Sequence, residues 1–185
     1  MINDVLNQAE IKMKKTVEVL RKDLASIRAG RANPAMLEKV SVDYYGTPTP
    51  INQLANISVP EPRLLLIQPW DKSSIKDIEK AILKSDLGLN PSNDGVVIRL
   101  AIPQLTAERR TEIVKSVKKK AEESRVAIRN IRRELIDDIK KREKDKIVSE
   151  DESKKGQDNA QKVTDKNIKD IDEILGKKEQ EIMEV

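Results

Sequence analysis

Four arginines stand close together between positions 125 and 133, and their chemistry is that of a phosphate-binding surface. At about 100° per residue on a helix, the side chains of Arg125, Arg129 and Arg132 fall within about 60° of one another. We call these three residues the arginine stripe. Arg133 flanks the stripe, and no acidic residue interrupts the segment. A guanidinium group donates paired hydrogen bonds to phosphate oxygens and base edges. The pattern therefore predicts an RNA-binding helix face.

The alternative interpretation is a helix face whose charges only keep it solvated, with acids nearby in balance. Residues 105–146 hold 15 basic and 9 acidic residues, whereas residues 147–185 hold 7 basic and 11 acidic residues. This local excess of basic residues over 105–146 favours binding of a polyanion at that part of the chain. A helical scaffold or partner-binding protein without RNA remains the rival hypothesis. Arg28 and Arg31, near the end of the first predicted helix, fit an RNA contact and the stabilisation of a helix C-terminus equally well.

Few residues of this sequence could carry catalysis. The chain has no Cys and no His, which excludes thiol nucleophiles, disulfides, the usual zinc sites and the commonest general base. It has no glycine-rich phosphate loop, dinucleotide-binding fingerprint or nucleophile elbow. Adjacent acids such as Asp137 and Asp138 diverge by about 100° on a helix and so do not form an acid–base pair. We predict a protein that is not an enzyme and uses no cofactor, metal or small-molecule substrate.

Aromatic residues make up 2% of the chain, with no Phe, so stacking on exposed bases is not expected as a general means of recognition. Tyr44 and Tyr45 would point to opposite sides of a predicted strand, one into the core and one outward. Trp70 is expected to contribute to packing. The predicted target is therefore structured RNA, recognised through its backbone and shape.

Three segments have the apolar spacing of amphipathic helices, and these helices must position the arginines. The first covers the first 28 residues, and the second runs from Thr106, a predicted N-cap, to about Lys146. The third opens with a capping box from Ser149 to Glu152. Because each has one apolar stripe and is not stable alone, we expect them to pack as an elongated three-helix bundle, formed by residues 1–29 and 105–185.

Residues 31–104 differ from the helical segments, because Gly and Pro recur and the apolar spacing shortens. This composition predicts a small β/α/β domain inserted between the first two bundle helices, and hence an α+β fold with two domains. We expect strand-like stretches at 40–44, 55–59, 63–68 and 96–100, a turn over 46–50 and a helix from about 73 to 85.

The insertion makes the chain cross between the domains twice, near 29–34 and 101–104. Gly30, Pro34 and Pro103 lie in these crossings. Paired short linkers permit a hinge about the line that joins them while limiting wider excursions. We therefore predict that the two domains change their relative angle.

The sequence also bears on location. Its first residues include an acid, Asp4, and no apolar run of signal-peptide length. No segment approaches the roughly 20 apolar residues needed to cross a bilayer. The lack of disulfides fits a reducing compartment. We expect a monomeric, cytoplasmic protein with no membrane partner.

Five motifs are spread over the chain: RAGRANP at 28–34, DYYGTPTP at 43–50, SDLGLNP at 85–91, LTAERR at 105–110 and RVAIRNIRR at 125–133. In these motifs the sequence resembles the bacterial ribosome recycling factor family. One departure is Glu38-Lys39, where the family often has an acid followed by Gly.

The resemblance implies an L-shaped molecule with the outer dimensions of a tRNA. It implies binding to the post-termination ribosome, with the bundle on large-subunit ribosomal RNA between the subunits. Elongation factor G would use GTP to drive the subunits apart, with release from mRNA, so hydrolysis would belong to that partner. By motif, Arg132 would be the principal RNA contact, with Arg129 beside it and Arg28 and Arg31 near the same surface.

Overall fold

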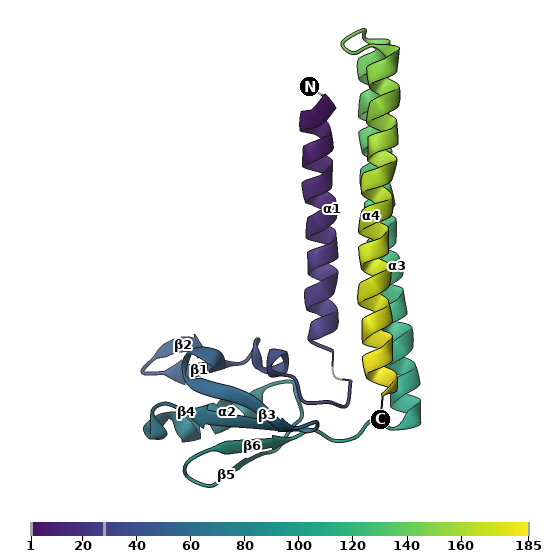
Figure 1. The fold of residues 1–185 in the computed structure, drawn as a ribbon. Helices are drawn as coiled ribbons and strands as arrows, with labels where there is room; N and C mark the ends of the chain where they lie inside the picture. The colour runs from purple at the N-terminus through teal and green to yellow at the C-terminus, as the bar shows by residue number, and fades with distance from the viewer. Residues whose placement is uncertain (1, 28, 185) are drawn as a thin grey trace. The chain divides into compact units, whose positions relative to one another are not determined.

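The computed structural model describes residues 2–27 and 29–184 (Figure 1). The chain divides into two compact units: unit 1 is formed by Met1–Leu24 and Arg110–Val185, and unit 2 by Ala25–Arg109. Unit 1 is helical and unit 2 contains the strands, which confirms the predicted α+β fold with a domain inserted into a helical bundle. Both crossing segments, 29–34 and 101–104, lie inside unit 2.

Unit 1 consists of three long helices, α1 (Ile2–Ala25), α3 (Ala107–Lys144) and α4 (Glu150–Met183). Figure 1 shows α1 beside the antiparallel pair formed by α3 and α4. Both predicted caps are present, because Arg109 N donates to Thr106 Oγ1 at 3.1 Å and Glu152 N donates to Ser149 Oγ at 3.1 Å. These bonds satisfy backbone donors that the first turn of a helix leaves unpaired.

The apolar stripes of the three helices meet in the core of unit 1. Gly156 of α4 brings the helices close together, since a Cβ atom there would lie 3.1 Å from Ile2 Cγ2 and 3.3 Å from Ile139 Cδ1. In the described part of the chain, no helix is long and apolar enough to cross a membrane. Fully or almost fully buried core residues include Met13, Val17, Leu20, Leu24, Val117, Ala121, Ile128, Ile139, Ala160, Ile171 and Ile182.

Unit 2 contains two antiparallel sheets and one α-helix, α2 (Ile75–Lys84), with a shared core that includes Val42, Leu65, Ile78 and Leu100. The first sheet pairs β1 with β2, and the second has the order β3-β4-β6-β5. Asp71 caps the short 3-10 helix that leads into α2, because its side chain accepts a hydrogen bond from Ser73 N. The strands are β1 (Ser41–Tyr44), β2 (Thr47–Pro50), β3 (Ala55–Glu61), β4 (Leu64–Pro69), β5 (Pro91–Asn93) and β6 (Ile98–Ala101).

Four local predictions need correction. The turn predicted over 46–50 is confined to Tyr45 and Gly46, and the residues after it form strand β2. Strand β5 was not predicted, and β6 begins at Ile98 instead of residue 96. Helix α1 ends at Ala25, before the predicted residue 28. Trp70 does not contribute to packing as predicted, because its side chain is 68% exposed.

The two crossing segments are both attached to the turn between β3 and β4. Ala32 N donates to Pro62 O at 2.8 Å, and Ile102 N donates to Arg63 O at 2.8 Å. The crossings therefore meet neighbouring residues of the same turn. Gly30 has a φ of +78°, and a Cβ atom there would lie 3.2 Å from Leu105 Cγ. Glycine is suited to this position by its backbone conformation and by the space available.

Candidate nucleic-acid interface

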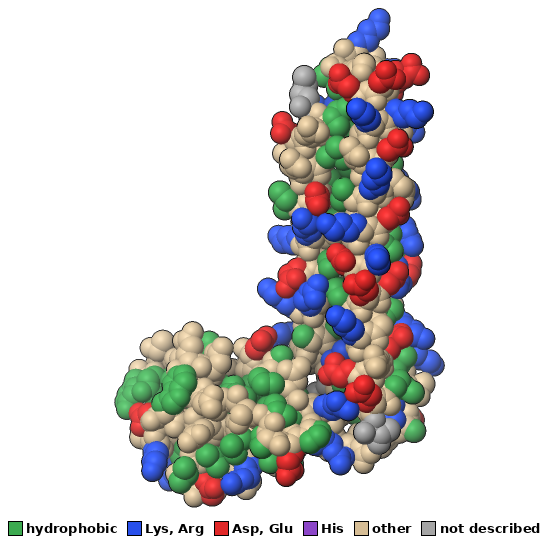
Figure 2. Space-filling view, viewed as in Figure 1, with side chains coloured by type: hydrophobic (Ala, Val, Ile, Leu, Met, Phe, Trp, Pro, Cys, Tyr) green, Lys and Arg blue, Asp and Glu red, His purple; other side chains and the backbone are tan. Residues whose placement is uncertain are grey.

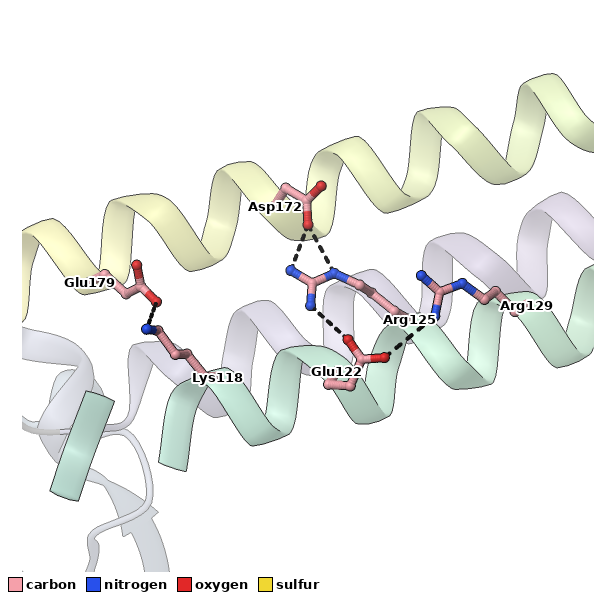
Figure 3. Close-up of polar contacts among 6 residues, drawn as sticks. All are labelled: Lys118, Glu122, Arg125, Arg129, Asp172 and Glu179. Carbon is pink, nitrogen blue, oxygen red and sulfur yellow. Dashed lines mark hydrogen bonds and ion pairs between the residues drawn. The ribbon is translucent and has the colours of Figure 1, made fainter. Parts of the chain in front are cut away.

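The arginine stripe lies on α3 beside the seam with α4. Lys118, Arg125 and Arg132 recur at intervals of seven, so they stack along one side of the helix. Two of them have an acidic partner on α4: Lys118 Nζ lies 3.9 Å from Glu179 Oε1, and Arg125 Nη2 lies 2.6 Å from Asp172 Oδ1 (Figure 3). The partners follow in reverse order along α4 because the helices are antiparallel.

Arg125 is held in place by the bundle itself. Its Nε and Nη2 both donate to Asp172 Oδ1, at 2.9 and 2.6 Å, and its Nη1 donates to Glu122 Oε2 at 3.0 Å. The side chain is 19% exposed. Burial alone would lower the pKa of Arg125, but the bonds to the two carboxylates outweigh it and raise the pKa. This guanidinium is charged, oriented and largely neutralised by its neighbours.

Arg132 reaches a neutral partner instead. The seven-residue register of the seam would place Asp165 opposite Arg132, but Arg132 Nη1 donates to Gln161 Oε1 at 2.6 Å. Gln161 in turn donates to Asp165 Oδ1 at 2.8 Å. The Nε of Arg132 is buried and has no hydrogen-bond partner among the described residues. The charge of Arg132 is therefore not neutralised by a carboxylate, and its buried Nε donor is unsatisfied.

Arg129 and Arg133 face solvent on the same helix. Arg129 Nη1 makes a long contact of 3.4 Å to Glu122 Oε1, and its side chain is 47% exposed. Arg133 is exposed and forms no side-chain hydrogen bond or ion pair within residues 2–27 and 29–184. Both guanidinium groups can turn toward a ligand without breaking a strong internal contact.

The other two predicted contacts lie elsewhere in the chain. Arg31 is half-buried in unit 2, and Arg28 lies outside the described residues. Figure 2 shows basic and acidic side chains interspersed over the visible face of unit 1. No broad basic field covers that visible face. In the described residues, no group of three or more acidic side chains is arranged to hold a metal ion.

Sequence reasoning found the arginines but not their partners on α4. The missed residues include Asp172, Gln161 and Asp165, together with Glu122 on α3. A usable signal was present, because acids on the third predicted helix also recur at intervals of seven: Asp158, Asp165, Asp172 and Glu179. Read in reverse against the basic residues of α3, this series gives the register of the seam.

Together, the fold and the seam define an α+β protein whose helical bundle carries exposed arginines along α3. The family model for "Ribosome recycling factor" matches residues 20–183. The chain is 69% identical to the ribosome-recycling factor of Syntrophomonas wolfei and 71% identical to that of Desulfitobacterium hafniense, with 100% of each chain covered. The chain therefore belongs to the ribosome recycling factor family.

Solved structures agree with this assignment. A solution structure of the ribosome recycling factor matches with a TM-score of 0.84 at 44% identity, covering 100% of this chain and 98% of that chain. The T. thermophilus ribosome recycling factor, described together with E. coli elongation factor G bound to the E. coli post-termination complex, matches with a TM-score of 0.71 at 48% identity. That match covers 100% of both chains.

Proposed function

We propose that this chain binds the post-termination ribosome and, with elongation factor G and GTP, promotes its dissociation into subunits and release from mRNA. The bundle binds large-subunit ribosomal RNA, with Arg132 as the principal contact and Arg129 and Arg133 beside it. The observation that carries the assignment is the seam of α3 and α4, where Arg132 has a neutral partner and an unsatisfied buried donor. We propose Arg125, Arg28 and Arg31 as further contacts.

The partners are proposed from relatives. The T. thermophilus factor, 48% identical over its full length, is described with elongation factor G on a post-termination complex. We further propose that this chain works in the cytoplasm and makes or breaks no bond itself, so that GTP hydrolysis belongs to elongation factor G. The composition supports this division of work, because the chain has neither Cys nor His.

The test of RNA binding is the salt dependence of the affinity for ribosomes. Each phosphate contact contributes about −0.7 to −0.9 to the slope of log affinity against log salt concentration. Contacts from Arg129, Arg132 and Arg133 alone should therefore give a slope of about −2 to −3, and the further contacts would make it steeper. Arg132→Ala should reduce the slope by about one contact. A response that does not change with salt would support the rival helical scaffold and overturn the proposal.

A further inference from the structure

The aromatic residues of the chain, one Trp and two Tyr, all lie in unit 2. The rings of Tyr44 and Tyr45 meet edge to face with centroids 4.6 Å apart. The Tyr44 hydroxyl donates to Asp71 Oδ2 at 3.4 Å, and Trp70 directly precedes Asp71. Tyr45 is 82% exposed and Trp70 is 68% exposed. Figure 2 shows hydrophobic side chains gathering at the end of unit 2 that carries the β1–β2 hairpin. We call Tyr44, Tyr45 and Trp70 the aromatic patch.

Tyr45 occupies a backbone position that does not suit it. Tyr44 pairs with Thr47, so Tyr45 and Gly46 form a two-residue hairpin loop with φ values of 50° and 81°. Positive φ at both positions is typical of a type I′ turn, for which Asn followed by Gly is preferred. Tyrosine pays a steric penalty in this conformation. The contact with Tyr44 offsets part of the penalty, but folding does not explain why so large a ring is left in solvent.

Charges around the aromatic patch favour a cationic ligand. The Asp71 carboxylate accepts a hydrogen bond from the Tyr44 hydroxyl, and exposed Asp43 precedes Tyr44 in strand β1. Hydrogen bonds from Ser73 lower the pKa of Asp71, with the Tyr44 hydroxyl adding to the effect, so this carboxylate is ionised at neutral pH. Lys72 is the adjoining cation in the chain. Aromatic faces and carboxylates together attract guanidinium groups, and the carboxylates repel phosphates.

We propose that the aromatic patch is a docking surface for a protein segment that presents an arginine side chain to the exposed ring of Tyr45. Asp71, bonded to the Tyr44 hydroxyl, supplies the opposite charge. The inference goes beyond the RNA contact of unit 1, because it gives unit 2 a protein partner. Its ribosomal test rests on the proposed function, since that partner is sought in the post-termination complex with elongation factor G.

The first experiment needs no ribosome. Trp70 is the sole Trp of the chain, so its fluorescence reports on the aromatic patch. We expect a short Gly/Arg peptide to change this fluorescence in a saturable way, and a Gly/Ser peptide to leave it unchanged. Tyr45→Asn should lower the affinity for the arginine peptide by roughly tenfold. Tyr45→Phe should leave the affinity unchanged, because phenylalanine keeps the ring face. Equal binding by the two peptides, or an unaffected Tyr45→Asn variant, overturns the proposal.

The second experiment locates the partner. The photo-crosslinking amino acid p-benzoylphenylalanine is placed at Tyr45 or, as a control, at Val96, which is 48% exposed in the same unit. Each variant is irradiated on purified post-termination ribosomes with elongation factor G. We expect a crosslink to protein from position 45, roughly tenfold above that from position 96. Crosslinks to RNA alone, or equal yields, overturn the proposal.

Co-sedimentation with ribosomes and thermal unfolding distinguish a failed docking surface from a failed proposed function and from an unfolded variant. A chain that fails to co-sediment with ribosomes contradicts the proposed function, and the peptide experiment alone then decides the docking surface. Tyr45→Asn should keep the Tm of unit 2 within a few degrees of wild type, because Asn suits the turn while the contact with Tyr44 is lost. A reduced peptide affinity in a folded variant then reflects the missing ring.

Discussion

Arg125 and Arg132 are equivalent in the sequence pattern but differ in what their guanidinium groups already contact. Arg125 is bound to two carboxylates, from Asp172 and Glu122. Arg132 contacts the neutral amide of Gln161 and retains a buried donor without a partner in the described chain. An arginine that is already neutralised has less to gain from a phosphate. We therefore propose that Arg125 is mainly structural and that Arg132 mainly serves RNA binding.

Replacing Arg132 by Ala should impair binding without unfolding the bundle. The side chain lies beside the core and its partner Gln161 is exposed, so stability should change by no more than about 0.5 kcal/mol. Loss of a charge-assisted RNA contact should cost about 1.5–3 kcal/mol, or roughly ten- to hundredfold in affinity. Arg132→Lys should recover part of this, because it keeps the charge but loses the planar fork. Thermal unfolding and affinity for vacant ribosomes at fixed salt measure both effects.

Two other variants serve as comparisons for Arg132→Ala. Arg125→Ala should lower the free energy of unfolding by about 1 kcal/mol, because it removes the ion pairs that the mostly buried Arg125 side chain makes with two half-exposed carboxylates. Lys120→Ala removes a cation from another side of the same helix and should leave affinity nearly unchanged. The assignment of the RNA surface is wrong if Arg132→Ala binds like wild type, or if it binds weakly only because it is unfolded.

The two kinds of element differed in how well the sequence predicted them. Helices α3 and α4 were recognised from apolar spacing and from caps at Thr106 and Ser149, because each signal is local. Strands β2 and β5 were missed because Pro48, Pro50 and Pro91 obscure the strand pattern. Proline is tolerated in edge strands, and both β2 and β5 are edges. Contacts such as that between Arg132 and Gln161 depend on helix packing, which neither helix specifies alone.

The loop between β5 and β6 should give unit 2 an acid-sensitive contribution to stability. Hydrogen bonds to Asp94 from the Val97 backbone, the Arg99 side chain and the Val96 backbone lower its pKa well below the ordinary value of 3.8. A lowered pKa in the folded state stabilises the fold above that ordinary value and loses its effect as pH falls below it. Asp94→Ala should therefore lower Tm at neutral pH.

The Tm difference between wild type and Asp94→Ala should narrow as pH falls from about 4 to about 2. Asp94→Asn keeps an oxygen acceptor for the two backbone N–H groups but does not titrate. We expect this variant to fall between the other two at neutral pH. The measurement is thermal unfolding of the three proteins across this pH range. A difference that is constant with pH would show that ionised Asp94 does not stabilise the loop.

At the scale of the whole molecule, we propose that Pro34 is not part of the hinge. The bending residues lie nearer to unit 1 along the chain. Ala32 and Ile102 are both bonded to the β3–β4 turn, and Pro34 begins a 3-10 helix whose Met36 and Leu37 are buried. These residues belong to unit 2 and should move with it. The residues left to absorb a change of angle are those near Gly30 on one crossing and those after Pro103 on the other.

Distance measurements between spin labels should show this motion. The chain has no Cys, so labels can be placed by pairs of substitutions without removing native thiols. Lys80→Cys with Lys169→Cys spans the two units, and Lys15→Cys with Lys169→Cys lies within unit 1. We expect a broad distance distribution for the first pair and a narrow one for the second. Equally narrow distributions would contradict the hinge.

The insertion of unit 2 also governs the order in which the bundle can assemble. A short turn joins α3 and α4, whereas α1 is separated from both by the whole of unit 2. Chain-closure entropy grows with the length of the intervening loop, so the α3–α4 hairpin should form before α1 docks. During synthesis, α1 leaves the ribosome first, and Leu6, Met13 and Leu20 then have no core to enter. The nascent chain therefore displays an uncovered apolar helix, the kind of surface that chaperones bind.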